Sequence, residues 1–317
     1  MPITLAEAKK NVQDDLQIGV IDEFAKSSFI MNNIIFDDVV SPTGGGTTMT
    51  YGYTRLKTQP TADFREVNNE YSPQEVTKER FNVDLKIFGG SFQIDRVIAD
   101  MGGIVSEVQL QMSQKIKAAS ALFNDTVING DSGVNAKAFD GLEKAVTGST
   151  TEFIPTAPID LSDSTAVDNN WRVFLDLLDE FLMGLDGAPS MIAGNTKLIA
   201  KIRGIARRAG QYQVTQNGFG QQVESYAGIP LVDLGAKAGT NDPVSAINGS
   251  GETSLYAVRF GMDGFHAVAP TENALIRTWL PDFSTSGAVK TGEVEMIAAV
   301  ALKTTKAAGI FRKIKVK

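Results

Sequence analysis

The strongest constraint on the fold is a run of apolar side chains that fits one long helix. Steps of three or four residues separate its members, which are Ile104, Val108, Met112, Ile116, Ala119, Phe123 and Val127. Such spacing places them on one face of an amphipathic α-helix. The helix would be about 26 residues and roughly 39 Å long. Gly130 stands where glycine commonly ends a helix. We therefore predict a helix over 102–130.

A β-hairpin is predicted before this helix. Phe81, Val83, Leu85 and Ile87 alternate with polar residues within 75–88, which is the pattern of a half-buried strand. Residues 47–57 also have β character, and the stretch between them, 59–74, is polar. We expect a long hairpin that Gly89-Gly90 ends. An isolated hairpin is marginally stable in water, so this one needs a surface to lie against.

Residues 1–40 have the pattern of an arm. Thr4 and Glu7 fit a capping box, and apolar residues then recur at helical spacing up to Val20. Large apolar groups follow, among them Phe24, Phe29 and Phe36, before the breaker at 41–46. We expect them to pack on the chain's own body or on a neighbour's.

The second half alternates helices and strands. A helix capped by Asn169 or Asn170 should run through Met183, and a basic helix should cover 196–209. Strands are expected at 191–193, 222–226, 229–232 and 254–260, and the chain returns to β structure at 293–302 and 310–316. A length of 317 residues suggests about two domains.

Composition excludes several kinds of site. The chain has no cysteine and one histidine, so disulfides, cysteine-ligated metals and the His-x-x-x-His zinc motif are excluded. It has no Gly-Lys pair for a phosphate loop and no Gly-x-Ser-x-Gly elbow. An enzyme would have to use His266 or paired carboxylates of the α/β part. We expect no cofactor, no metal and no catalytic residue.

Charge and hydropathy limit the partners. A net charge of −7 argues against a duplex-DNA binder that uses its whole surface. The apolar run 296–302 is far shorter than the ~20 residues of a membrane helix, and the first ten residues do not form a secretory signal. The C-terminus is locally basic, and its cations either face DNA or protect a solvated edge strand. They include Lys303, Lys306, Arg312, Lys313 and Lys315.

Six segments, in order, resemble one known family. They are Thr4-Leu5-Ala6-Glu7-Ala8, Phe88-Gly89-Gly90, the stretch 123–131, Phe139-Asp140-Gly141-Leu142, the stretch 226–232 and the stretch 256–261. Together with the order of the predicted elements, they resemble the major capsid proteins of tailed bacteriophages, which share the Hong Kong 97 shell fold. The resemblance covers essentially the whole chain.

The resemblance implies an α+β fold with four parts. These are an N-terminal arm (1–46), an extended loop (47–90, a β-hairpin), a peripheral domain (91–154 and 276–317) with the long helix 102–130 as its spine, and a mixed α/β axial domain (155–275). Loop and arm would contact neighbouring subunits. Candidates for those contacts are Phe24, Phe29, Phe36, Phe64, Arg65, Glu66, Asn69 and Tyr71.

The family's function follows as an expectation. Copies would form pentamers and hexamers of an icosahedral or prolate virion capsid, assembled in the cytoplasm of a host bacterium around double-stranded DNA. Scaffolding, portal and decoration proteins are further expected partners, the DNA contact would be nonspecific, and no membrane is involved. An alternative within the same fold is an encapsulin-like nanocompartment that stores a cargo enzyme.

Overall fold

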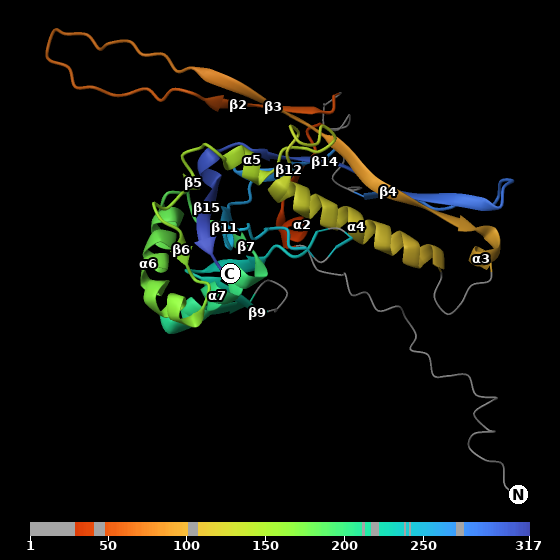
Figure 1. Cartoon of the computed structure of the whole chain (residues 1–317). Helices are drawn as coiled ribbons and strands as arrows, with labels where there is room; N and C mark the ends of the chain where they lie inside the picture. The colour runs from red at the N-terminus through yellow and green to blue at the C-terminus, as the bar shows by residue number, and fades with distance from the viewer. Residues whose placement is uncertain are drawn as a thin grey trace, which may run out of the picture.

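The computed structural model describes residues 29–40, 48–100, 107–210, 213–216, 222–237, 239–240, 242–270 and 276–317. These residues form two β-sheets with helices packed against them and a separate two-stranded hairpin (Figure 1). Within these ranges, no helix is both long and apolar enough to span a membrane.

Strand β14 (Val289–Leu302) is the centre of a five-stranded sheet. The other strands are β1 (Phe36–Asp37), β4 (Lys86–Asp95), β12 (Phe265–Val268) and β13 (Ile276–Trp279). β4 pairs antiparallel with β14, from Val289 opposite Asp95 to Ala298 opposite Lys86. β13 and β12 pair with β14 one after the other, and β1 is parallel to β12.

Helix α4 (Glu107–Asn129) runs along β4 and β14 and confirms the predicted long helix, although 102–106 lie outside the described residues. Its buried Met112 and Ala119 pack against Phe92, Ile94 and Val294 of the sheet. The long extension formed in this way ends at the short helix α3 (Arg96–Asp100), near the start of α4 and far from α6 and α7 (Figure 1).

An eight-stranded sheet forms the other part of the molecule. Its strands are β5 (Glu152–Phe153), β6 (Ile159–Asp160), β7 (Met191–Gly194), β8 (Gln213–Gln216), β9 (Gln222–Tyr226), β10 (Ile229–Asp233), β11 (Glu252–Val258) and β15 (Ala308–Lys315). Helices α6 (Ser164–Met183) and α7 (Thr196–Arg208) pack against it. The buried core between them includes Phe174, Ile202 and Phe311.

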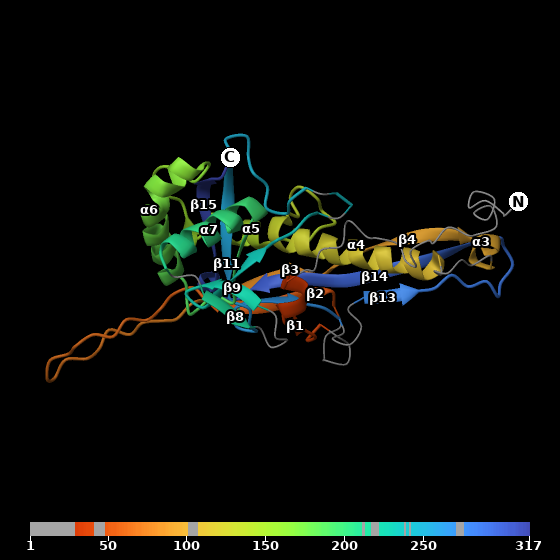
Figure 2. The same cartoon turned by 90° about the horizontal axis from the view of Figure 1, so that it is seen from below.

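A central core joins the two sheets. It contains Phe123 of α4, Tyr256 of β11 and Met296 of β14. The short elements α2 (Phe29–Asn33), α5 (Leu142–Val146) and the 3₁₀ turn η3 (Thr305–Ala307) also contribute to it. The third unit is the hairpin of β2 (Thr50–Leu56) and β3 (Lys78–Asp84), which projects from the body in both views (Figures 1 and 2).

The single strand predicted over 75–88 is wrong, because the chain divides it at Leu85. Leu85 is buried outside both strands, and its N–H donates to the Met49 carbonyl at 2.8 Å. Because side chains alternate along a strand, one residue outside the strand pattern moves the following side chains to the opposite face of the sheet. Ile87 is therefore exposed, whereas Phe88 packs on the core.

Gly89-Gly90 does not end the hairpin, as predicted, but lies inside β4. A Cβ at Gly89 would stand 1.9 Å from the Val294 carbonyl oxygen, so close strand approach is the reason for glycine there. The hairpin instead ends at Asp84.

Two further expectations differ from the structure. Helix α6 begins at Ser164 with Asp163 as its cap, rather than at Asn169 or Asn170. Its first turns are polar, so the apolar stripe showed only the later part. In addition, the predicted unit 276–317 is divided, because β13 and β14 join the five-stranded sheet whereas β15 pairs with β11 in the other sheet.

We expect Gly89→Ala to lower the free energy of unfolding by about 3 kcal/mol or more, because backbone atoms cannot make room for the new methyl group. The matched control is Gly204→Ala within α7, where a Cβ meets nothing within 4 Å. That substitution should raise stability by about 0.5–1 kcal/mol. Chemical denaturation of both variants measures the difference. Equal stability of the two would contradict the packing of β4 on β14.

Candidate assembly interface

Backbone and side-chain hydrogen bonds hold the part of the extended loop beyond its strands. β2 and β3 are in register from Thr50 opposite Asp84 to Leu56 opposite Lys78. Past that pair, the Lys57 N–H donates to the Thr77 carbonyl at 2.8 Å. Further out, Thr61 and Gln74 exchange two hydrogen bonds of 2.7 Å through the glutamine amide. The loop therefore stays a narrow, extended structure far from the body (Figure 1).

The loop tip is a small organised turn around Arg65. The guanidinium donates to the Asn69 carbonyl at 3.1 Å and lies 5.6 Å from the centre of the Tyr71 ring. The Asn69 N–H donates to the Glu66 carbonyl at 3.2 Å. The structure thus brings these four predicted contact residues together.

Apolar side chains of the tip lie open to solvent. Phe64 is fully exposed, and Val67, Tyr71 and Val76 are exposed to lesser degrees. Four large apolar groups on one projecting element are unusual for a surface without a partner. The tip is therefore the strongest candidate for an interface in the described part of the chain.

The predicted contact residues of the arm lie elsewhere. Phe24 falls outside the described residues. Phe29 packs against the central core, and the Phe36 ring lies 5.9 Å from the Phe123 ring. Both side chains contact their own chain, and an intersubunit contact through them stays a prediction.

The base of the loop is anchored to the end of β14, which the sequence did not indicate. The Tyr53 hydroxyl donates to the Leu302 carbonyl at 3.0 Å, and Arg55 Nε donates to the Lys303 carbonyl at 2.8 Å. A second Arg55 nitrogen donates to the Leu302 carbonyl. The guanidinium also lies 4.4 Å from the centre of the Phe81 ring, a cation–π geometry.

A buried polar cluster lies beside this anchor. Asp37 is 3% exposed and accepts a 2.8 Å hydrogen bond from the Tyr51 hydroxyl. His266 Nε2 and Lys303 Nζ lie 3.9 and 4.0 Å from the same Asp37 oxygen, Oδ2. Burial and the bond to Asp37 raise the pKa of Tyr51 above its usual range. Burial, followed by the charge of Lys303, lowers the pKa of His266 to about 4.

This position bears on the enzyme alternative. The His266 side chain is 0% exposed, so it has no route to a substrate in this arrangement.

The basic C-terminal residues largely meet partners within the chain. Arg312 bridges Glu143 and Glu152, Lys315 lies 3.3 Å from Asp160, and Lys313 Nζ donates to the Pro155 carbonyl at 3.4 Å. Lys303 faces Asp37, as described above, and Lys306 is exposed. These contacts neutralise part of the local positive charge. A DNA-facing role for the five residues stays a prediction.

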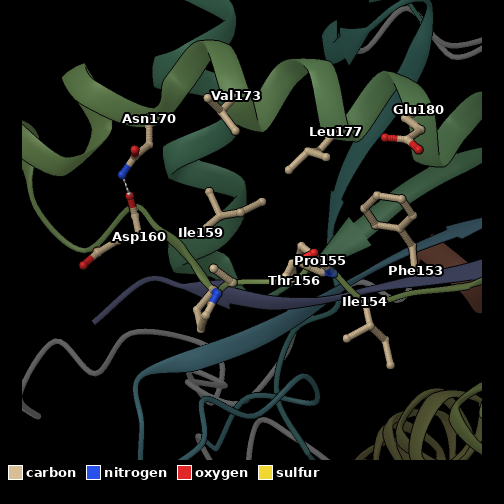
Figure 3. Close-up of a pocket in the computed structure, with 12 residues that line it drawn as sticks. Phe153, Ile154, Pro155, Thr156, Ile159, Asp160, Asn170, Val173, Leu177 and Glu180 are labelled. Atoms are coloured by element: carbon tan, nitrogen blue, oxygen red, sulfur yellow. Dashed lines mark hydrogen bonds between the residues drawn. The ribbon is translucent and has the colours of Figure 1, made fainter.

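A groove of about 490 Å³ lies between α6 and the segment 153–160 (Figure 3). Val173 and Leu177 of α6 line one side, and the amide of Asn170 donates to the Asp160 carbonyl at 2.9 Å across it. The titratable lining side chains are Asp160, which pairs with Lys315, and Glu180. This lining provides no nucleophile beside a base, so the groove is a weaker candidate than the loop.

Comparison with known proteins gives a match at the level of structure alone. No family model and no curated protein matches the sequence. Among solved structures, the SrpI encapsulin complex of Synechococcus elongatus PCC 7942 matches with a TM-score of 0.69 and 13% identity, over 99% of this chain and 97% of that one. The capsid of a native GTA particle matches with a TM-score of 0.65 and 12% identity, over 98% and 97%. The capsid of Myoviridae phage XM1 matches with a TM-score of 0.59 and 12% identity, over 98% and 99%.

The chain has the Hong Kong 97-like fold. The match covers nearly the whole of each chain, so the likeness is not confined to one sheet. The predicted fold class is confirmed. Within this fold, the extended loop is the projecting β2–β3 hairpin and the spine helix is α4.

We expect Arg55→Met to loosen the base of the loop, because two carbonyl groups lose a charged donor. Amide hydrogen exchange in β2 should become about tenfold faster or more, which corresponds to ~1.4 kcal/mol of local stability. The control is Arg80→Met on β3, whose side chain bonds to the neighbouring Asn82 at 3.2 Å. If both variants exchange alike, Arg55 is not the anchor.

Proposed function

We propose that this chain is the major capsid protein of a tailed bacteriophage, whose copies assemble into a closed shell around double-stranded DNA. The Hong Kong 97-like fold over the full chain supports this, because the solved structures it matches include assembled capsids. The shell would be the virion capsid, built in the cytoplasm of the host bacterium. The protein's role would be structural, without a chemical step.

The extended loop carries the proposal. The loop beyond its strands exposes Phe64, Val67 and Tyr71 near the tip and Val76 nearer the strands, and the chain itself does not cover them. Burial of one phenylalanine side chain stabilises by about 1.5–3 kcal/mol, so a partner that covers the tip gains substantially. A second copy of the chain is the partner that a shell protein always has.

The contact would run from the loop of one copy to the body of the next. Such a head-to-tail contact uses different surfaces on the two partners and therefore generates rings when the rotation closes. Pentamers and hexamers are such rings. Scaffolding, portal and decoration proteins and nonspecific contact with the genome belong to the same proposal.

An encapsulin-like compartment is the second candidate, and the similarity to the SrpI encapsulin complex favours it. The contents of the assembled particle distinguish a capsid from an encapsulin-like compartment. Nuclease-resistant duplex DNA in particles from the native source supports the capsid, and a packaged protein in place of DNA supports the compartment.

Electron microscopy of the purified full-length chain, together with size-exclusion chromatography, tests assembly itself. Closed shells, or rings of five and six subunits, are expected. A monodisperse monomer, alone and after co-expression with the scaffold from the same genome, would contradict the proposal.

Shortening the loop should abolish assembly and leave the fold intact. The register places Thr58 opposite Val76, so Asn-Gly can replace residues 59–75 as a two-residue hairpin turn. The removed residues are exposed, and we expect the melting temperature to change little. Sedimentation velocity should show a folded monomer. Normal closed shells from this variant would exclude the loop as an essential contact.

Substitution of Phe64 should weaken assembly in proportion to the apolar area lost. Phe64→Asp removes about 2 kcal/mol per contact, which raises the concentration needed for assembly roughly thirtyfold. Phe64→Leu keeps most of the apolar area and should change it severalfold at most. Light scattering across a concentration series measures both. Similar behaviour of the two variants would mean that Phe64 stays in solvent.

A further inference from the structure

The Asp37 cluster lies where four separate segments of the chain meet. Asp37 belongs to β1, Tyr51 to β2, His266 to β12, and Lys303 follows the end of β14. β2 leads directly into the extended loop. A change of charge in this cluster therefore acts on the attachment of the loop and of β1 together.

The charges of the cluster balance only while the imidazole is neutral. The Asp37 carboxylate and the Lys303 ammonium carry opposite charges, and both Lys303 and His266 lie within 4.0 Å of the same carboxylate oxygen. A proton on His266 would place a second positive charge beside the ammonium group, on a side chain that is 0% exposed, whereas Lys303 is 28% exposed. Burying such a charge is costly.

Few groups around the His266 ring favour a proton on it: the Asp37 carboxylate and the Gly264 backbone do, and burial together with Lys303 outweighs them. Neither ring nitrogen makes a hydrogen bond of normal geometry within the described part of the chain. The ring instead meets Tyr51 edge to face, with 5.7 Å between the ring centres. The Tyr51 hydroxyl donates its hydrogen bond to Asp37, and the hydroxyl of the nearby Tyr53 donates to the Leu302 carbonyl. Among the residues that the structure describes, Asp37 is the acidic group found beside the imidazole.

β1 and β2 have fewer strand pairings to the body than the strands beside them. Within the described residues, β1 has two residues and pairs only with β12. β2 and β3 form their own sheet, and Tyr51, Tyr53 and Arg55 of β2 bond to residues of the body. In contrast, β12 and β14 are built into the five-stranded sheet.

We propose that the Asp37–His266–Lys303 cluster is an acid-sensitive latch, which holds β1 and the base of the extended loop on the body and releases them when His266 takes up a proton. The release is local, because β1 and β2 can leave while the pairing of β12 with β14 persists.

The pH window follows from the histidine. Its ordinary pKa is about 6.5 and the closed cluster lowers it to about 4. The open form exposes the imidazole and binds a proton at the ordinary value, so acid favours opening. The stabilisation of the closed form is complete above pH 6.5 and is lost as the pH falls to 4. The opening constant rises by roughly 100-fold between pH 7 and pH 4, and its limit at lower pH is about 300-fold.

The latch does not depend on the proposed function, since it belongs to the single chain. If the loop makes the intersubunit contact, acid would also weaken that contact. A test on unassembled chains keeps the two ideas separate, because failure of the latch would leave the shell proposal unaffected.

Hydrogen exchange measured by mass spectrometry between pH 7 and 4, corrected for intrinsic rates, is the test. The informative amides are Ala267, which donates to the Ile35 carbonyl at 2.9 Å, and Ala269, which donates to the Asp37 carbonyl at 3.0 Å. Both bonds join β12 to the β1 segment. Their protection should fall about 30-fold or more by pH 4.5 in the unmodified chain, while amides of α7 keep theirs.

The variant His266→Gln cannot titrate, so its protection should stay flat over the same range. His266 is the only histidine, so a ¹⁵N NMR titration of labelled histidine gives a single signal and works without any variant. An imidazole that titrates near 6.5 in the closed chain would overturn the latch. So would equal acid sensitivity of the unmodified chain and the glutamine variant, or loss of protection in α7 at the same pH.

Discussion

The pairing of β14 positions the five-stranded sheet, helix α4 and the base of the extended loop. Along one edge it holds β4, and along the other it holds β13 and then β12. α4 packs on the face of β4 and β14, β1 is attached through β12, and the last carbonyls of β14 hold the loop through Tyr53 and Arg55. One strand therefore sets the direction of the long extension made by α4 and β4 and the direction of the extended loop.

That pairing depends on close approach of the two backbones. A Cβ at Gly89 would meet the Val294 carbonyl, and a Cβ at Gly292 would lie 2.5 Å from the Phe92 ring. The glycines give up the conformational stability that a side chain provides in a strand. In return, the Phe92 ring occupies the space beside Gly292 and packs against the buried side of α4.

The sequence was most informative where the signal is local. The apolar stripe of α4 needs only its own spacing, and the prediction holds from Glu107 to the glycine that follows the helix. The alternation across 81–87 is equally regular, yet it failed at Leu85. The cause lies some two hundred residues away, because pairing with β14 decides which face of β4 is buried. Local periodicity carries no information on such a partner.

The candidate site shows the same division. The polar, proline-containing tip could be recognised from residue types, and the turn around Arg65 forms from residues close in sequence. The anchor at the base of the loop could not be recognised from residue types, because Arg55 bonds to backbone carbonyls, which every residue has. The basic C-terminus shows the converse. No acidic residue lies near its cations in the sequence. In the structure, however, Arg312 pairs with Glu143 and Glu152, and Lys315 pairs with Asp160.

A firm base and an exposed tip suit a contact between copies. Ordering a flexible segment on binding costs about 0.5–1.5 kcal/mol for each immobilised side chain, so an element that is already directed loses less when it docks. Here the guanidinium of Arg55 and the hydroxyl of Tyr53 fix the direction within the single chain. The tip keeps its apolar side chains uncovered until a partner arrives. The strength of the contact therefore depends on the anchor at β14 as much as on the residues that touch the neighbour.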